Sequence, residues 1–226
     1  GHESTILKTS DGGNSWEINR YNPDDERFYM SVNFITANKG YVLGTDGELW
    51  VTEDAGENWR LTILSVEEWY QNHLFAISKI DNTFLVVGER GGIFTKKSGQ
   101  TEWNAISSPY EGSFFGVNKV GNNFLVFGMS GNLYLLNSST LAWVKVETGT
   151  DQFLLESASI ESTGGALVVG RGGIILVVNH EGTLTNTIQS QSRADYTAVT
   201  VQNNKVYLSS MTGGVTEMSL SDLIQK

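Results

Sequence analysis

The chain contains 226 residues, of which 39% are hydrophobic and 18% charged, with 25 glycines, 2 prolines and no cysteine. This composition is typical of a globular protein with many tight turns, and the missing cysteines exclude disulfides, thiolate metal sites and thiol nucleophiles. The formal net charge of −10 opposes sequence-independent binding to nucleic acid and to anionic membrane surfaces. No apolar run approaches the length of about 18 residues that spans a membrane, so we expect no membrane insertion.

The first complete unit of the chain sets a pattern that later units repeat. β-type runs are expected at residues 28–35, 41–44, 48–52 and 59–63, separated by Gly, Asn and Asp turn residues. An apolar run like the second one recurs along the chain, and the successive runs end at Gly44, Gly88, Gly128, Gly170 and Ser210. These ends are 44, 40, 42 and 40 residues apart. A period of about 40 to 45 residues is that of a propeller blade.

The second run of each unit is apolar at nearly every position, as residues 85–87 and 167–169 illustrate. Such strands are expected where both faces of a sheet pack against neighbouring sheets. No segment shows a sustained helical period, which excludes a parallel sheet with crossover helices, and a two-layer sandwich would alternate more cleanly. The sequence therefore predicts an all-β fold, a β-propeller of four-stranded antiparallel blades, as one domain over residues 1–226.

Two turns carry a more specific motif than the repeat itself. Residues 9–16 read Thr-Ser-Asp-Gly-Gly-Asn-Ser-Trp and residues 52–59 read Thr-Glu-Asp-Ala-Gly-Glu-Asn-Trp. In such a turn an Asp accepts backbone hydrogen bonds, a Gly supplies a positive φ and a Trp covers the hairpin. The structural residues predicted in these roles are Asp11, Gly13, Trp16, Asp54, Gly56 and Trp59.

Both turns resemble the aspartate box, Ser/Thr-x-Asp-x-Gly-x-Ser/Thr-Trp, of sialidase-type propellers, with Asn58 in place of the usual hydroxyl residue. Residues 1–13 and 87–94 also resemble repeats of bacterial proteins related to the photosystem II assembly factor. The resemblance covers the whole chain through the repeat, although the box decays after residue 59. It implies a propeller that acts as a chaperone-like scaffold and binds a protein partner.

The number of blades follows from how the two ends of the chain meet. Aligning Trp16 with Trp59 places Gly1 on Gly44, so the chain starts with the outer half of a blade. Pairing that half with runs at residues 196–202 and 205–210 would close a ring of five blades and hide both edge strands. Residues 214–219 can form a competing third strand, which leaves a six-bladed ring or a fragment of a larger propeller as alternatives. Residues 221–226 are expected to form a short helical turn.

In a propeller, the turns between second and third strands and the connections between blades gather at one face, which we call the loop face. The binding candidates there are His2, Asp46, Trp69, Tyr70, Arg90 and Arg171. Arg90 and Arg171 lie in equivalent turns, and an arginine cluster is what the resemblance implies for a protein partner; solvated or locally paired arginines are the alternative. Trp69 and Tyr70 interrupt a polar connection and can contact a protein or stack on a sugar, or fold back on the core.

The sequence offers no convincing catalytic site. The three histidines, His2, His73 and His180, have no metal-ligand spacing, so we expect neither metal nor cofactor. A sialidase needs three converging arginines, and Arg20 and Arg60 are peripheral. The first-strand positions expected to line the axis are small or neutral and indicate a water-filled channel: Ser31, Asn33, Ala76, Ser78, Gly116, Asn118, Ser157, Ser159, Ala198 and Thr200.

Two hypotheses remain. The first is a non-catalytic scaffold, periplasmic or secreted from a bacterium, that binds a protein partner through its loop face. The second is a carbohydrate-active propeller, either a lectin-like binder that uses Trp69 and Tyr70 or a glycoside hydrolase with a carboxylate pair drawn from Asp24 or Asp25 and Glu67 or Glu68.

Overall fold

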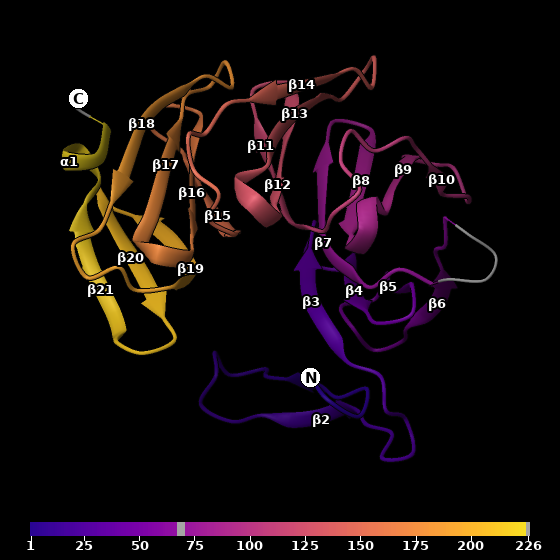
Figure 1. Ribbon diagram of the computed structural model, residues 1–226. Helices are drawn as coiled ribbons and strands as arrows, with labels where there is room; N and C mark the ends of the chain where they lie inside the picture. The colour runs from indigo at the N-terminus through magenta and orange to yellow at the C-terminus, as the bar shows by residue number, and fades with distance from the viewer. Residues whose placement is uncertain (67–70, 225–226) are drawn as a thin grey trace.

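The structure is a computed structural model that describes residues 1–66 and 71–224, and within these ranges it consists of antiparallel sheets arranged around an axis (Figure 1). The N-terminal hairpin is formed by β1 (Ile6–Lys8) and β2 (Glu17–Arg20). The first blade contains β3 (Tyr29–Phe34), β4 (Gly40–Gly44), β5 (Glu48–Thr52) and β6 (Arg60–Ile63), paired in chain order. The predicted runs of this unit agree with the observed strands to within one residue.

The same meander repeats along the chain. The second blade contains β7 (Leu74–Ile80), β8 (Thr83–Gly88), β9 (Ile93–Lys97) and β10 (Asn104–Ala105); the third contains β11 (Phe114–Val120), β12 (Asn123–Gly128), β13 (Leu133–Asn137) and β14 (Trp143–Val146); the fourth contains β15 (Leu154–Ile160), β16 (Gly165–Gly170), β17 (Ile174–Val178) and β18 (Leu184–Gln189). The last sheet contains β19 (Tyr196–Gln202), β20 (Lys205–Ser210) and β21 (Gly214–Ser219), followed by α1 (Leu220–Ile224). The predicted β-propeller class is confirmed.

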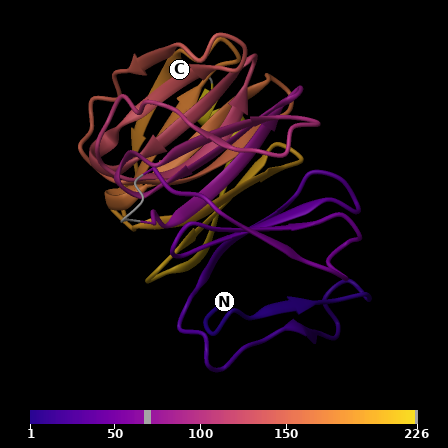
Figure 2. The same cartoon turned by 90° about the vertical axis from the view of Figure 1, so that its right-hand side faces the viewer.

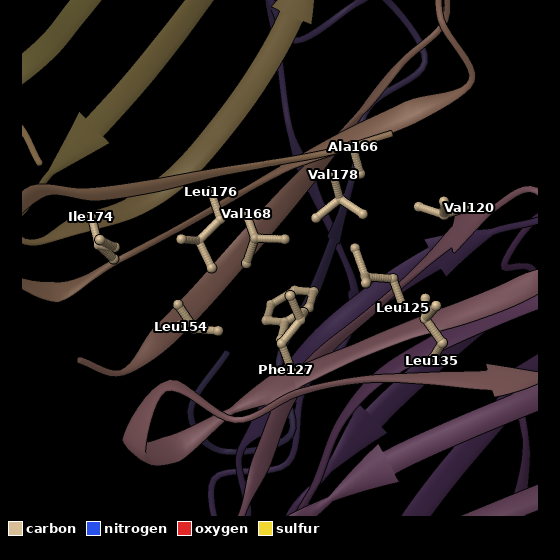
Figure 3. Packing of buried hydrophobic residues seen from close by; sticks show 11 residues of the cluster. Val120, Leu125, Phe127, Leu135, Leu154, Ala166, Val168, Ile174, Leu176 and Val178 are labelled. Atoms are coloured by element: carbon tan, nitrogen blue, oxygen red, sulfur yellow. The ribbon is translucent and has the colours of Figure 1, made fainter. Parts of the chain in front are cut away.

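In the first four blades, alternate residues of the second strand enter different cores, as the apolar runs predicted. On β8, Phe84 and Val86 pack toward the first blade, whereas Leu85 and Val87 pack toward the third. A similar core joins the third and fourth blades around the fully buried Phe127 (Figure 3). Because the second, third and fourth blades are covered on both faces, they cannot separate from their neighbours without exposing apolar area to water.

The predicted pairing between the two ends of the chain is not seen in the part of the chain that the structure describes. β1 pairs with β2, and β20 pairs with β19 and β21, so residues 214–219 take the third-strand position. Only three residues separate β20 from β21, and a short connection loses less entropy than pairing with a strand 200 residues away. Figures 1 and 2 show the hairpin beside β3 and apart from the last sheet. The number of blades stays a prediction.

Both aspartate boxes form the hydrogen-bonded turn around their Asp. Asp54 Oδ1 accepts hydrogen bonds from Thr52 Oγ1 at 2.9 Å and from Asn58 N–H at 2.8 Å, while Asn58 Nδ2 donates to Oδ2 at 2.8 Å. The amide of Asn58 thus replaces the usual hydroxyl donor. These bonds lower the pKa of Asp54 to about 2. Trp59 Nε1 donates to Asn19 Oδ1 of β2 at 3.0 Å, which ties the first blade to the hairpin.

Trp16 differs from the prediction because its side chain is 59% exposed. Its box nevertheless forms, since Asp11 accepts from Thr9 Oγ1 at 2.8 Å and from Ser15 N–H at 2.9 Å. Gly13 and Gly56 have φ values of 93° and 86°, as the motif requires. The turn therefore depends on its hydrogen bonds rather than on the cover of the tryptophan.

A short helical turn was predicted at residues 221–226, and α1 covers Leu220–Ile224, while residues 225 and 226 lie outside the described residues. Leu220 and Leu223 bury their side chains against the core between the fourth blade and the last sheet. Asn186 Nδ2 donates to the carbonyl of Leu223 at 2.9 Å. Within the described ranges, no helix has the length and apolar character needed to cross a bilayer.

Candidate functional site

The first strand of every sheet from β3 to β19 contains a register shift at its second residue, at the loop face. The unpaired residues are Met30, Phe75, Phe115, Leu155 and Thr197. A β-bulge leaves one residue out of the ladder and re-aims its side chain. Because the first strands of a propeller surround its axis, these bulges place one side chain per sheet around the mouth of the central channel.

Four of the bulged residues, Met30, Phe75, Phe115 and Leu155, line a single cavity of about 410 Å³. We call these four residues the apolar collar. The rings of Phe75 and Phe115 are 5.6 Å apart, and Phe115 lies 6.0 Å from Phe153, so a row of three aromatic rings crosses the second, third and fourth blades. The collar gives this largely polar cavity an apolar rim, which can contact an apolar side chain of a ligand.

Two charged groups accompany the collar. Glu156 lines the same cavity, and although its side chain is exposed to the channel, partial desolvation by the surrounding walls raises the pKa of its carboxyl group. Its Oε1 accepts a hydrogen bond from the N–H of Ser157 at 2.8 Å. The guanidinium of Arg171 lies 4.7 Å from the ring centroid of Phe153, which is within cation–π distance. A ligand that fills the collar therefore meets a carboxylate on one strand and a guanidinium beside the aromatic row.

The wall of the channel is more polar than the collar. Asn118 Nδ2 donates to Ser157 Oγ at 3.1 Å, and Ser159 Oγ donates to Asn118 Oδ1 at 3.1 Å, which joins the third and fourth blades. Ser31, Asn33, Ala76 and Gly116 also line the collar cavity. Some of the small and neutral residues predicted to line the axis therefore do line the cavity, but the prediction did not include the bulged residues of the collar.

A sequence signal for the bulges does exist. Four of the first strands begin with two adjacent bulky apolar residues: Tyr29-Met30, Leu74-Phe75, Phe114-Phe115 and Leu154-Leu155. In a regular strand, adjacent residues point to opposite faces, so such a pair breaks the alternation at one point. The prediction missed the collar because it assumed an uninterrupted period of two along each first strand.

Backbone hydrogen bonds hold the turns of the loop face in place. η1 (Glu89–Gly91), η2 (Met129–Gly131) and η3 (Arg171–Gly173) follow the second strands of three successive blades. In each turn, the N–H of the first residue donates to the carbonyl of the residue just before the first strand of the same blade. The acceptor carbonyls are those of His73 at 2.9 Å, Ser113 at 3.0 Å and Phe153 at 2.9 Å. The collar is therefore presented by a rigid frame.

The predicted equivalence of Arg90 and Arg171 is correct for the turn but not for the position within it. Arg90 is the second residue of η1 and has a positive φ of 51°, as Ser130 and Gly172 have in their turns. Arg171 is the first residue of η3 and corresponds to Glu89 and Met129. Both arginines are exposed. Arg171 lies next to the collar, because its guanidinium stacks on the ring of Phe153, which in turn lies beside Phe115 of the collar.

The other candidates are placed as follows. His2 is exposed, packs edge-on against Phe28 at 4.5 Å and does not line the collar cavity. Asp46 is half-buried, and its N–H donates to His73 Nδ1 at 3.2 Å, which links the first two blades. Trp69 and Tyr70 lie outside the described residues, as do Glu67 and Glu68.

Asp25, a member of the hypothetical carboxylate pair, is already paired with a cation. Arg27 Nε and Nη2 donate to its two oxygens at 2.6 and 2.8 Å, and Ser4 Oγ donates at 2.7 Å. These bonds hold the pKa of Asp25 far below its usual range, with the Arg27 hydrogen bond as the largest cause. A carboxylate so stabilised cannot serve as a proton donor near neutral pH. Among the described residues, no group of His, Asp and Glu has an arrangement that could hold a metal ion.

The comparisons with known proteins agree with this architecture. Residues 1–222 match the family model described as Photosynthesis system II assembly factor YCF48. The chain is 29% identical over 108 residues to the chloroplastic photosystem II stability/assembly factor HCF136 of Arabidopsis thaliana, an alignment that covers 46% of this chain and 27% of that protein. The chain thus spans only about a quarter of the length of that curated relative.

Two solved structures share the fold at low sequence identity. YCF48 from Cyanidioschyzon merolae superposes with a TM-score of 0.71 at 13% identity, covering 97% of this chain and 78% of that one. A structure titled YCF48 bound to D1 peptide superposes with a TM-score of 0.67 at 15% identity, covering 86% of this chain and 66% of that one. The family model extends over nearly the whole chain, and the protein therefore belongs to the YCF48 family of photosystem II assembly-factor β-propellers.

Proposed function

We propose that this protein is a non-catalytic scaffold that binds an extended segment of a protein partner on its loop face, with an apolar side chain of that segment inserted into the apolar collar. The observation that carries the proposal is the collar itself: four bulged side chains from four blades line one cavity at the axis. Interface anchors are typically large apolar side chains that fill such concave sites.

Three further observations support this function. The turns around the collar are held by backbone hydrogen bonds, so little ordering entropy is lost on binding. The family to which the chain belongs is named for assembly factors, and one solved structure with the same fold carries a peptide. Glu156 and Arg171 offer opposite charges near the collar, which can fix the direction of a bound segment.

Selection of random peptides displayed on phage tests the proposal. Selected peptides are expected to share one large apolar residue, and fluorescence anisotropy then gives their affinity for the purified protein. Replacing Phe115 by Ala, or the more exposed Met30 by Gln, is expected to weaken binding at least about tenfold, which corresponds to about 1.4 kcal/mol. Val144→Ser is the matched control, because Val144 is an apolar residue on β14 that is 59% exposed and lies outside the collar.

Peptides that bind Phe115→Ala, Met30→Gln and the wild type equally would refute the collar as the binding site. A carbohydrate ligand is the alternative, based on Trp69 and Tyr70. If a glycan array shows sugar binding that is lost when both are replaced by Ala, while no peptide binds, then the scaffold proposal is wrong.

A further inference from the structure

A second cavity lies at the face opposite the loop face, between the first and second blades. Its volume is about 610 Å³, larger than that of the collar cavity. Four cationic residues from different segments line it: Lys39 in the turn between β3 and β4, Arg60 at the start of β6, Lys79 near the end of β7 and Lys96 in β9. We call these residues the cationic cluster.

The cluster concentrates positive charge in an acidic protein. Glu53 is the only carboxylate among the described residues that line the cavity, and its Oε1 lies 2.8 Å from Lys39 Nζ. In the part of the chain that the structure describes, Arg60, Lys79 and Lys96 form no ion pair with a carboxylate. The cavity therefore has a surplus of three positive charges, whereas the whole chain carries a net charge of −10.

Aromatic rings hold two of the ammonium groups in place. Lys96 Nζ lies 4.9 Å from the ring centroid of Trp103, and Lys79 Nζ lies 5.3 Å from that of Phe84. Burial lowers the pKa of Lys96, and repulsion from Lys39 and Arg60 lowers it further. An anion in the cavity would relieve that repulsion, so the cluster favours binding of negative charge.

An independent observation comes from Tyr41. Its side chain is 0% exposed, it lines the cavity, and its hydroxyl has no hydrogen-bond partner among the described residues. Burial raises the pKa of Tyr41 to about 12, so the hydroxyl keeps its proton at neutral pH. A buried hydroxyl without a partner is unfavourable, and a ligand oxygen that accepts its proton would remove that cost.

We propose that this cavity binds the phosphate group of a small phosphorylated molecule, with Tyr41, Lys39 and Lys96 as the groups that contact its oxygens and Arg60 and Lys79 as further counter-charges. A surplus of three cations suits a dianionic or more highly charged ligand better than a single carboxylate. Phe84 and Ile35 provide an apolar wall and Ser98 and Thr101 a polar one, which leaves room for an organic group next to the phosphate. This site lies on the other face from the collar and goes beyond the proposed function.

Isothermal titration calorimetry on the full chain at low ionic strength tests the site. The probes are inorganic phosphate, pyrophosphate and glucose 6-phosphate. Binding of at least one is expected, with a strong dependence on salt. Binding of inorganic phosphate would identify the free ion as a ligand, whereas binding of glucose 6-phosphate alone would identify a phosphate ester, and either result supports the site.

Variants separate this site from general attraction of anions. Lys39→Gln and Lys96→Gln are each expected to weaken binding at least tenfold, and Tyr41→Phe, which keeps the packed ring, by several fold. Lys145→Gln is the charge-matched control, because Lys145 lies on β14 next to Glu147 and outside the cavity. The proposal is overturned if none of the probes binds the wild type, or if Lys145→Gln weakens binding as much as Lys96→Gln. Thermal unfolding of each variant verifies that it is folded.

Discussion

Replacing Arg27 by methionine is expected to destabilise the protein more than most substitutions of a partly exposed residue. Arg27 bonds to both oxygens of Asp25, and its Nη1 lies 2.5 Å from Oε1 of Glu48. The side chains of Asp25 and Glu48 are only 5% and 0% exposed. Methionine has a similar length but no charge, so the variant leaves two buried carboxylates without their cation.

The magnitude follows from the burial of the two acids. Removing one partner of a buried ion pair typically costs about 3 to 5 kcal/mol. Because the Arg27 side chain is 40% exposed, water already screens part of its attraction. We therefore expect a loss of about 3 kcal/mol, which is a large share of the roughly 5 to 15 kcal/mol that keeps a typical protein folded.

Urea unfolding at pH 7, followed by tryptophan fluorescence, measures this loss. Arg27→Lys is the control, because it keeps the charge but not the two hydrogen bonds to Asp25, and an intermediate loss of stability is expected.

The pH dependence of stability gives a second measurement. The folded pKa of Asp25 is lowered, so its contribution is present above the unfolded value of 3.8 and is lost as the pH falls below it. The stability gap between wild type and Arg27→Met should therefore narrow below about pH 4. A gap below about 1 kcal/mol at pH 7 would falsify this reasoning.

Two further predictions concern the turns. The pKa of Asp54 is about 2 in the folded protein against an ordinary 3.8, so its contribution to stability is complete above about pH 4 and is lost as the pH falls toward 2. Asp54→Asn is expected to lower the midpoint temperature of unfolding at pH 7 and to reduce the loss of stability between about pH 4 and about pH 2. An unchanged dependence of stability on pH would contradict the stabilising role of the Asp54 carboxylate. Gly131→Ala is expected to cost more than Gly149→Ala, because both have positive φ values, 66° and 70°, but only at Gly131 would a Cβ collide with the carbonyl of Thr150. Strain in the left-handed region alone costs about 1 to 3 kcal/mol. Equal losses in urea unfolding would show that the close approach to Thr150 is unimportant.

The sequence by itself determined the strands, the repeat and the aspartate boxes, because each depends on residues that are neighbours in the chain. The alternation of Phe84 and Val86 with Leu85 and Val87 is a local pattern, and it predicted that each blade packs on two others. The box around Asp54 is likewise closed by residues within four positions of it. Hydrogen bonds over such short spans form in nearly the same way wherever the turn lies.

Tertiary structure decided which chemically suitable segments meet. Either residues 4–9 or residues 214–219 could extend the last sheet, and the short connection to β20 favoured the latter. The adjacent bulky pairs that contain Phe75 and Phe115 mark a break in the alternation, but they do not say which rings meet, and only the packing of the blades brings these two rings together at the channel mouth.

The candidate sites show the same division. Arg90 and Arg171 looked equivalent, yet they differ by one residue in their position within the turn, and Arg171 lies over Phe153. The cationic cluster brings together four separate segments of two blades, and no local pattern marks Lys39 and Lys96 as neighbours. Contacts between residues distant in the chain depend on how the blades pack, and this is the physical reason that only the tertiary structure revealed the collar and the cluster.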